Sequence, residues 1–118
     1  MKKVGLVTVL YNSESVLNDF FKSLSVQTYN NIILYIIDNN SSDLSLQKSQ
    51  ELVQQYCTFP TKFIINNDNT GVAAANNQGI KAAIEDNVDY ILLLNNDIIF
   101  SAETIKTLVD FAVLNNEQ

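Results

Sequence analysis

The residues best suited to chemistry follow directly on an apolar run in the second half of the chain. Residues 90–94 are all apolar or aromatic, and Asn95, Asn96 and Asp97 come next. The run is too short for a membrane span and has no helical stripe, so it predicts a strand buried on both faces. In open α/β sheets, ligands bind at the carboxyl ends of strands. A carboxylate such as Asp97 in that place can hold a divalent cation, and the cation can hold a phosphate.

Three earlier apolar runs lead into similar polar clusters. Asn, Asp and Ser suit turns and helix caps, and this is the simplest interpretation of any one cluster. Four such clusters at the same edge of one sheet favour a polar cleft instead. The three runs are residues 4–10, 32–37 and 62–65, and the clusters after them are residues 11–13, 38–43 and 66–69.

The segments between the runs carry helical patterns. Apolar residues at helical spacing predict one helix with Asn12 or Ser13 as its N-cap and a last helix capped by Ser101. Weaker patterns predict helices over residues 44–56 and 70–85, and the small residues of the latter suggest a helix close to the sheet or to a ligand. Strands that alternate with helices predict an α/β fold, a three-layer Rossmann-like parallel sheet in the order 3-2-1-4 with helices on both faces.

Composition narrows the class of protein. The 118 residues suffice for one domain, and a net charge of −6, with seven Lys and no Arg or His, argues against nucleic-acid binding. The single Cys57 can form no internal disulfide. No segment has the pattern of a signal peptide or the roughly 18 apolar residues of a membrane span, so we expect a soluble, cytoplasmic chain.

In their order along the chain, the clusters and the runs before them resemble the family-two glycosyltransferases with the GT-A fold. The resemblance covers nearly the whole chain. It is strongest to the rhamnosyltransferase-like branch, which builds bacterial surface polysaccharides. The matching segments are residues 7–12, 23–27, 36–43, 69–80 and 90–97.

This resemblance implies a donor-binding role. Residues 1–118 would be the nucleotide-sugar-binding half of a GT-A glycosyltransferase domain, truncated at the C-terminus. Enzymes of this kind transfer a sugar from a nucleotide-diphosphate sugar, here a UDP- or dTDP-sugar, to a saccharide or lipid-linked acceptor, with inversion and with a divalent metal. Family members continue with strands that carry the acceptor pocket and the catalytic base. We therefore assign no catalytic residue and expect the isolated chain to be inactive.

The resemblance also implies roles for individual residues. Asp38 would recognise the base, and Asp97 would bind the Mn²⁺ or Mg²⁺ that bridges the diphosphate. The first carboxylate of the family's Asp-x-Asp element is replaced by Asn95, which weakens the charge presented to the metal. The other residues implied in nucleotide binding are Thr8, Tyr11, Asn12, Asn40, Asn69, Gly71, Asn76 and Asn96.

The chemistry itself also points to a metal. The diphosphate gains negative charge as its bond to the sugar breaks, and Arg, Lys or a metal usually neutralises it. No Lys lies in the four clusters, so a cation on Asp97, helped by helix N-termini, is the remaining option. We expect structural roles for the nearby Asp43, as a helix cap, and Asp68, in a turn. The same interpretation applies to Asn39, Asn66, Asn67 and Asn77.

Two other kinds of function remain open at this point. A nucleotidyltransferase also places carboxylates and a metal at strand ends. It usually has a Gly-rich phosphate loop and basic residues after the first strand, where this chain has Tyr11, Asn12 and Ser13. A receiver- or flavodoxin-like module is disfavoured, because paired acids after the first strand and a Lys after the last are missing. A binding-only or vestigial nucleotide-binding module is the other alternative.

The predicted strand order places residues 90–94 at one side of the sheet. A strand there exposes backbone N–H and C=O groups that can pair with another chain, and this run has no Lys or Pro to prevent it. We therefore expect self-association through this strand, or low solubility.

Overall fold

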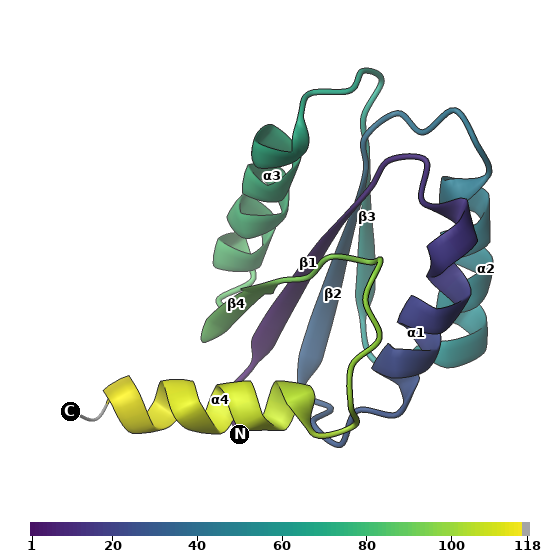
Figure 1. The fold of residues 1–118 in the computed structure, drawn as a ribbon. Coiled ribbons are helices and arrows are strands. Elements are labelled where there is room, and N and C mark those ends of the chain that lie inside the picture. Colours follow the sequence, from purple (N-terminus) through teal and green to yellow (C-terminus); the bar gives the residue numbers. More distant parts are fainter. Residues whose placement is uncertain (117–118) are drawn as a thin grey trace.

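The computed structural model describes residues 1–116, and a four-stranded parallel sheet lies at its centre (Figure 1). The strands lie in the order β3-β2-β1-β4, and all three neighbouring pairs are parallel. This confirms the predicted order 3-2-1-4. The strands are β1 (Val4–Leu10), β2 (Ile32–Asp38), β3 (Thr61–Ile65) and β4 (Tyr90–Leu93).

Helices cover both faces of the sheet, as predicted. In Figure 1, α1 and α2 stand on one side and α3 on the other. α4 crosses the end of the sheet at which β1 begins, and its Ile105 and Val109 join the core on the α1 side. The helices are α1 (Leu17–Ser25), α2 (Ser45–Tyr56), α3 (Val72–Glu85) and α4 (Thr104–Asn116), with a short 3₁₀ turn, η1 (Glu14–Val16), before α1. None of the helices within residues 1–116 is both long and apolar enough to cross a membrane.

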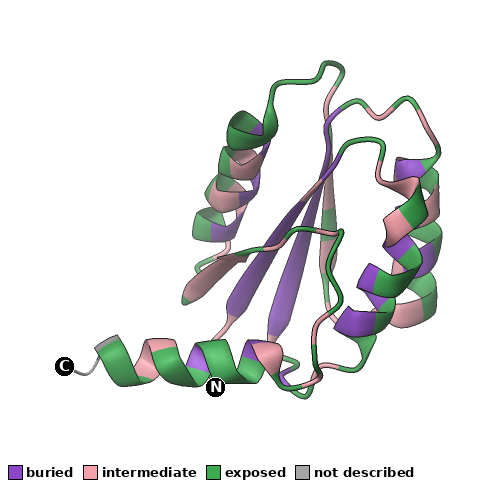
Figure 2. Ribbon diagram, in the orientation of Figure 1, coloured by how far each residue is buried: buried purple, intermediate pink, exposed green. Residues whose placement is uncertain are grey.

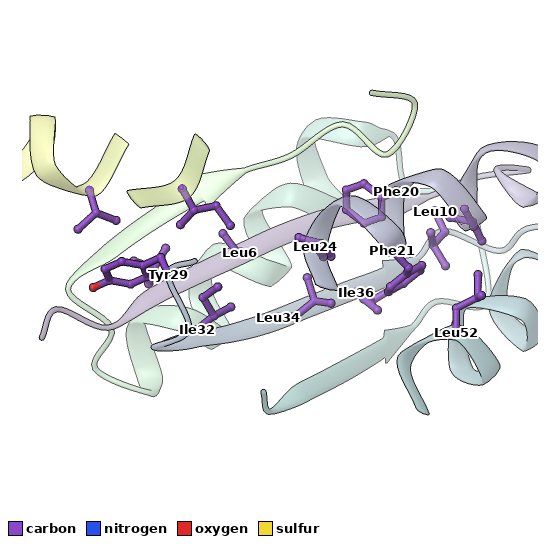
Figure 3. Packing of buried hydrophobic residues seen from close by; sticks show 14 residues of the cluster. Leu6, Leu10, Phe20, Phe21, Leu24, Tyr29, Ile32, Leu34, Ile36 and Leu52 are labelled. Carbon is purple, nitrogen blue, oxygen red and sulfur yellow. The ribbon is translucent and has the colours of Figure 1, made fainter. Parts of the chain in front are cut away.

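The two faces of the sheet have separate cores because successive side chains along a strand point to opposite faces. The larger core joins β1 and β2 to α1, α2 and α4, and Figure 3 shows Phe20 and Phe21 of α1 above the strands. The smaller core lies under α3, where Ala75 and Ala83 pack against the strands. The strand residues of that smaller core are Val7, Ile33, Tyr35 and Ile37.

The prediction that residues 90–94 form a strand buried on both faces is wrong. β4 ends at Leu93, its first three residues are half-buried, and Leu93 is 48% exposed. Figure 2 shows the contrast with the buried β1 and β2. The reason is position: β4 pairs with β1 alone and forms an edge of the sheet, so fewer side chains surround it than surround the central strands.

The first helix also begins differently from the prediction. α1 starts at Leu17 after the η1 turn, and neither Ser13 before η1 nor Val16 before α1 caps it with a side-chain hydrogen bond. Asn12 has a positive φ of 51° and turns its side chain toward another loop. Since α1 begins late, the segment between β1 and α1 remains a loop at the carboxyl end of the sheet.

Candidate functional site

The carboxyl ends of β1 and β4 open into a pocket of about 420 Å³, which we call the Asp97 pocket. This is the polar cleft that the strand-end clusters predicted. Its polar wall combines the loop after β1, the first two turns of α3 and the loop after β4. It is lined by Val9, Asn12, Ser13, Ser15, Val16, Val72, Asn76, Leu93, Leu94, Asn95, Asn96 and Asp97.

A second pocket of about 270 Å³, the Tyr11 pocket, adjoins the first. Val9, Ser13 and Val72 line both pockets, so the two form one branched depression at the carboxyl edge of the sheet. The half-exposed ring of Tyr11 forms part of the wall of the Tyr11 pocket. The remaining lining residues are Asn39, Asn69 and Gly71.

The loop after β4 is tied to β1 by side-chain hydrogen bonds. The Thr8 hydroxyl, fully buried, donates to the carbonyl oxygen of Leu94 at 2.8 Å. The Asn96 amide nitrogen donates to the Thr8 hydroxyl oxygen at 3.2 Å and to the carbonyl oxygen of Val9 at 2.7 Å. Thr8 thus lies outside both pockets and fixes the segment that presents Asp97.

Asp97 is exposed and lines the Asp97 pocket together with amide side chains from its own loop and from two other segments. Its other side borders a smaller cleft of about 110 Å³ that Asp19 also lines. Residues 1–116 contain no group of three His, Cys, Asp or Glu side chains that could enclose a metal ion. A single carboxylate among amide side chains fits instead an ion of the Mg²⁺ type, held by one carboxylate and otherwise by phosphates and water.

The residues at the end of β2 and directly after it differ in whether they line a pocket. Asp38 is 4% exposed and lines neither pocket. Its Oδ2 accepts a hydrogen bond of 3.4 Å from the Ser41 amide, and its buried Oδ1 has no hydrogen-bond partner within the described residues. Asn40 is exposed, with φ at 62°. The residue of this segment that reaches a pocket is Asn39.

Asn39 is a pocket residue that sequence reasoning missed, because an Asn in such a cluster also suits a turn. It is 2% exposed, and its amide bonds both to the segment before α3 and to Asn66 after β3. One signal for this contact exists in the strand register. Asp38 pairs with Ile65, so the next residues, Asn39 and Asn66, leave neighbouring strands side by side.

Two loops at the carboxyl edge hold each other through short polar side chains. The Asn12 Oδ1 accepts hydrogen bonds from the Ser42 amide at 2.8 Å and from its hydroxyl at 3.1 Å. Asp43 accepts from the Ser45 amide at 2.9 Å and closes a turn just before α2. The N-cap of α2 is Leu44, without a side-chain cap hydrogen bond, so the predicted capping role of Asp43 is wrong. The other Asp43 oxygen accepts from the Glu14 amide at 3.2 Å and thereby joins the two loops.

These hydrogen bonds affect the charge of Asp43. Burial pushes its pKa upward, but the hydroxyl and amide of Ser45 and the amide of Glu14 stabilise the carboxylate more strongly. The pKa of Asp43 therefore lies below its ordinary value of 3.8. The carboxylate that joins these loops is fully ionised at neutral pH.

α3 begins at the junction of the two pockets. Gly71, the residue before it, has φ 85° and ψ 155°, a conformation that other residues rarely adopt, and no side chain caps the helix. Val72, the first helical residue, lines both pockets, and Asn76 one turn later lines the Asp97 pocket. The positive end of the helix dipole and its free N–H groups thus face the depression.

Comparison with known proteins identifies the family. A profile of glycosyl transferase family 2 matches residues 6–118. The chain belongs to this family. An uncharacterized glycosyltransferase of Haemophilus influenzae is 28% identical to the domain over 116 residues, which are 98% of this chain and 44% of that protein. This glycosyltransferase domain therefore spans less than half the length of that curated relative.

Solved structures share the fold of this glycosyltransferase domain. S. aureus TarS 1-349 in complex with UDP-GlcNAc superposes with a TM-score of 0.80 at 22% identity, over 92% of this chain and 30% of that one. The mannosyltransferase PcManGT from Pyrobaculum calidifontis, in complex with GDP-Man and Mn²⁺, gives 0.80 at 14% identity, over 88% of this chain and 30% of that one. These matches confirm the GT-A fold class.

Proposed function

We propose that this domain binds the nucleotide-diphosphate sugar of a glycosyltransferase in the two adjoining pockets. The observation that carries the proposal is the joint presence of Asp97 and the uncapped start of α3 at one pocket. A diphosphate can be bound in two complementary ways, by a cation held on a carboxylate and by a helix N-terminus. The similar TarS and PcManGT structures, solved with UDP-GlcNAc and GDP-Man, support a donor of this class.

The two pockets suggest how the donor lies. The Tyr11 ring can stack on a nucleobase, and Asn69 beside it offers polar contacts at the base edge. The diphosphate and sugar would then occupy the Asp97 pocket, which is larger and richer in amides. We propose a pyrimidine donor, UDP- or dTDP-linked, because the smaller Tyr11 pocket suits the smaller class of base.

A divalent cation, Mg²⁺ or Mn²⁺, belongs to the proposal. Asp97 would hold it from the protein side, and the amide side chains of Asn76 and Asn95 line the same pocket. When bound, the cation neutralises the charge that develops on the departing diphosphate. No Lys lines either pocket, and the chain has no Arg, so its own side chains offer no substitute for the cation.

The reaction proposed for the whole protein is an inverting transfer. An acceptor hydroxyl oxygen bonds to the anomeric carbon, the bond from that carbon to the diphosphate breaks, and the hydroxyl proton passes to a base. Within residues 1–116, Asp97 is assigned to the cation, and Asp38 and Asp43 are held by loop amides. Because no carboxylate other than Asp97 lines either pocket, we propose that this chain alone binds the donor without transferring the sugar.

A binding-only module is the second candidate, and the same lack of an assignable base favours it. The two candidates share the donor site and differ in what the rest of the protein contributes. For the enzyme, we propose a saccharide or lipid-linked acceptor on the cytoplasmic side of a bacterial membrane, as in the polysaccharide-building branch that the sequence resembles.

Calorimetry tests the donor site. The chain is titrated with UDP, dTDP and GDP, with and without Mn²⁺, and we expect Mn²⁺-dependent binding that is tighter for the pyrimidine nucleotides. Asp97→Ala should remove the Mn²⁺ dependence. Asp68→Ala is the matched control, because it removes an exposed carboxylate that lines neither pocket. This variant should bind the nucleotides as the unchanged chain does. Equal binding by the Asp97→Ala variant would refute the assignment of the metal ligand.

A further inference from the structure

The amide of Asn39 joins the segments that leave β2 and β3 to the segment that enters α3. We propose that Asn39 is a positioning residue, which holds residues 69–71 in the conformation that forms one wall of the Tyr11 pocket. The inference deepens the proposed function, since it concerns the end of the donor site at which we place the base. It assigns Asn39 no direct contact with the nucleotide.

Every hydrogen-bonding group of this amide is already engaged. The Asn39 Nδ2 donates to Asn69 Oδ1 at 2.8 Å and to the carbonyl oxygen of Gly71 at 3.3 Å. Its Oδ1 accepts from the Thr70 amide at 3.1 Å, from the Thr70 hydroxyl at 3.0 Å and from Asn66 Nδ2 at 3.2 Å. An amide side chain has two N–H donors and two lone pairs, so none is left for a ligand.

Asn39 is itself held in place from the other side. Its backbone N–H donates to the carbonyl oxygen of Leu10 at the end of β1, at 2.9 Å. Its partner Asn66 exchanges two hydrogen bonds with Gln78 of α3, at 2.7 and 2.9 Å. Gln78 lines neither pocket. The network therefore ties the ends of three strands to α3 behind the pocket wall.

The segment that Asn39 holds needs such support. Gly71 has φ at 85°, and Asn69 closes a tight turn by accepting the Gly71 amide at 3.0 Å on its Oδ1. Both residues are exposed, so burial of their own side chains cannot fix the segment. Buried hydrogen bonds to one amide are the contacts that select this conformation, and they set where Asn69 and the start of α3 stand.

Three variants of the chain separate this role from general stability. Asn39→Ala removes the whole amide. Asn39→Asp keeps acceptors for Thr70 but loses the donors to Asn69 and Gly71. Asn69→Ala alters only an exposed side chain, and it serves if the variants of the buried Asn39 fold poorly. Asn77→Ala, which removes an exposed amide of α3 that lines neither pocket, is the matched control.

The first readout is hydrogen exchange at the amides of Thr70 and Gly71, which needs no ligand. We expect both amides to exchange faster in Asn39→Ala. In Asn39→Asp and in Asn69→Ala, only the Gly71 amide should exchange faster. In Asn77→Ala, the exchange of both amides should be unchanged. Unchanged exchange of both amides in Asn39→Ala would overturn the proposal, even if the variant were less stable overall.

The second readout compares two probes, UDP and pyrophosphate, each with Mn²⁺. Because the proposed role concerns the end of the site that holds the base, Asn39→Ala should weaken the affinity for UDP about tenfold, the effect of one lost buried hydrogen-bond network. The affinity for pyrophosphate should change by no more than about twofold. An equal loss for both probes would indicate general loosening and refute positioning. If the unchanged chain binds neither probe, the proposed function fails, while the exchange result still decides the role of Asn39.

Discussion

The side-chain amide of Asn96 donates a hydrogen bond of 3.2 Å to the hydroxyl oxygen of Thr8, although 88 positions separate the two residues. The same hydroxyl donates to the carbonyl oxygen of Leu94 at 2.8 Å, so one buried group satisfies partners on both sides of the turn after β4. Asp97 follows this turn directly. The position of the proposed metal ligand therefore depends on a residue inside β1.

Removal of the Thr8 hydroxyl is expected to loosen that turn. Thr8→Val keeps the shape of the side chain but removes the hydroxyl that bonds the Leu94 carbonyl, and it leaves the Asn96 amide only its bond to the Val9 carbonyl. We expect a cost of about 1–3 kcal/mol in the free energy of unfolding. Mn²⁺-dependent binding of UDP should weaken as well. Urea unfolding and calorimetry measure the two effects. Thr8→Ser, which retains the hydroxyl, should preserve UDP binding, and loss of binding in that variant alone would contradict the argument.

Gly79 provides a test of how closely α3 lies on the sheet. A Cβ built there would overlap the Val7 side chain and stand 2.9 Å from Cδ1 of Ile37. Gly79→Ala should therefore lower the free energy of unfolding by about 1–3 kcal/mol through overpacking. This exceeds the gain of up to about 1 kcal/mol that Ala normally brings to a helix interior. Thermal or urea unfolding measures the change.

The double variant Gly79→Ala with Val7→Ala is the control for this prediction. Val7→Ala removes the side chain that the added methyl group would meet, so the two substitutions should cost less together than the sum of their separate costs. Strict additivity would show that α3 can move away from β1 and that the close approach is not specific.

Much of this fold follows from the sequence, because the signal is strong where apolar runs are continuous. β1 and β2 are buried along their length, and their runs predicted both strands. The close approach of α3 likewise follows from its small residues. The burial of β4 could not be predicted from its run, because a run of apolar residues reports composition and not the number of neighbouring strands.

The polar clusters show the same limit more sharply. They predicted a cleft at the carboxyl edge, and the pockets there confirm it. Which polar side chain faces the cleft and which supports it depends on strand register and on partners far along the chain. Thr8 and Asn39 make their hydrogen bonds to residues distant in sequence, and no local pattern reveals such contacts.

The stability of the chain should fall in acid through Asp43 and Asp86. Burial raises the pKa of Asp43, but hydrogen bonds from Ser45 lower it by more. Hydrogen bonds from Lys62 and Tyr35 lower the pKa of Asp86. Carboxylates with a lowered folded pKa stabilise the fold above their unfolded value of 3.8. That stabilisation is lost as the pH falls below 3.8 and through the lower folded pKa.

Asp43→Asn tests this account. The variant should be less stable at neutral pH and show a flatter loss of stability below pH 4, because one of the titrating groups is gone. Unfolding in urea at a series of pH values measures the slope. Asp68→Asn, at an exposed position with no hydrogen bond in the described part of the chain, is the control and should keep the original slope. An unchanged slope in Asp43→Asn would contradict the role of these hydrogen bonds.

The last prediction concerns the outer side of β4. The N–H groups of Tyr90 and Leu94 donate to the carbonyl oxygens of Lys3 and Val7, so by alternation those of Ile91 and Leu93 point away from β1. Edge strands with this exposure pair with other chains, and β4 carries no charged residue to prevent it. We predict that the chain associates with a second copy through β4, with a molar mass in light scattering that rises with concentration.

A charge on that edge should keep the chain monomeric. Leu93→Lys places an ammonium group at an edge position that is 48% exposed. Leu114→Lys makes the same change at a 60% exposed position on α4 and should leave association unchanged. If β4 is the contact, the amides of Ile91 and Leu93 become protected from hydrogen exchange as the concentration rises. Rapid exchange of both amides at every concentration, with a constant monomer mass, would show that this edge stays unpaired in solution.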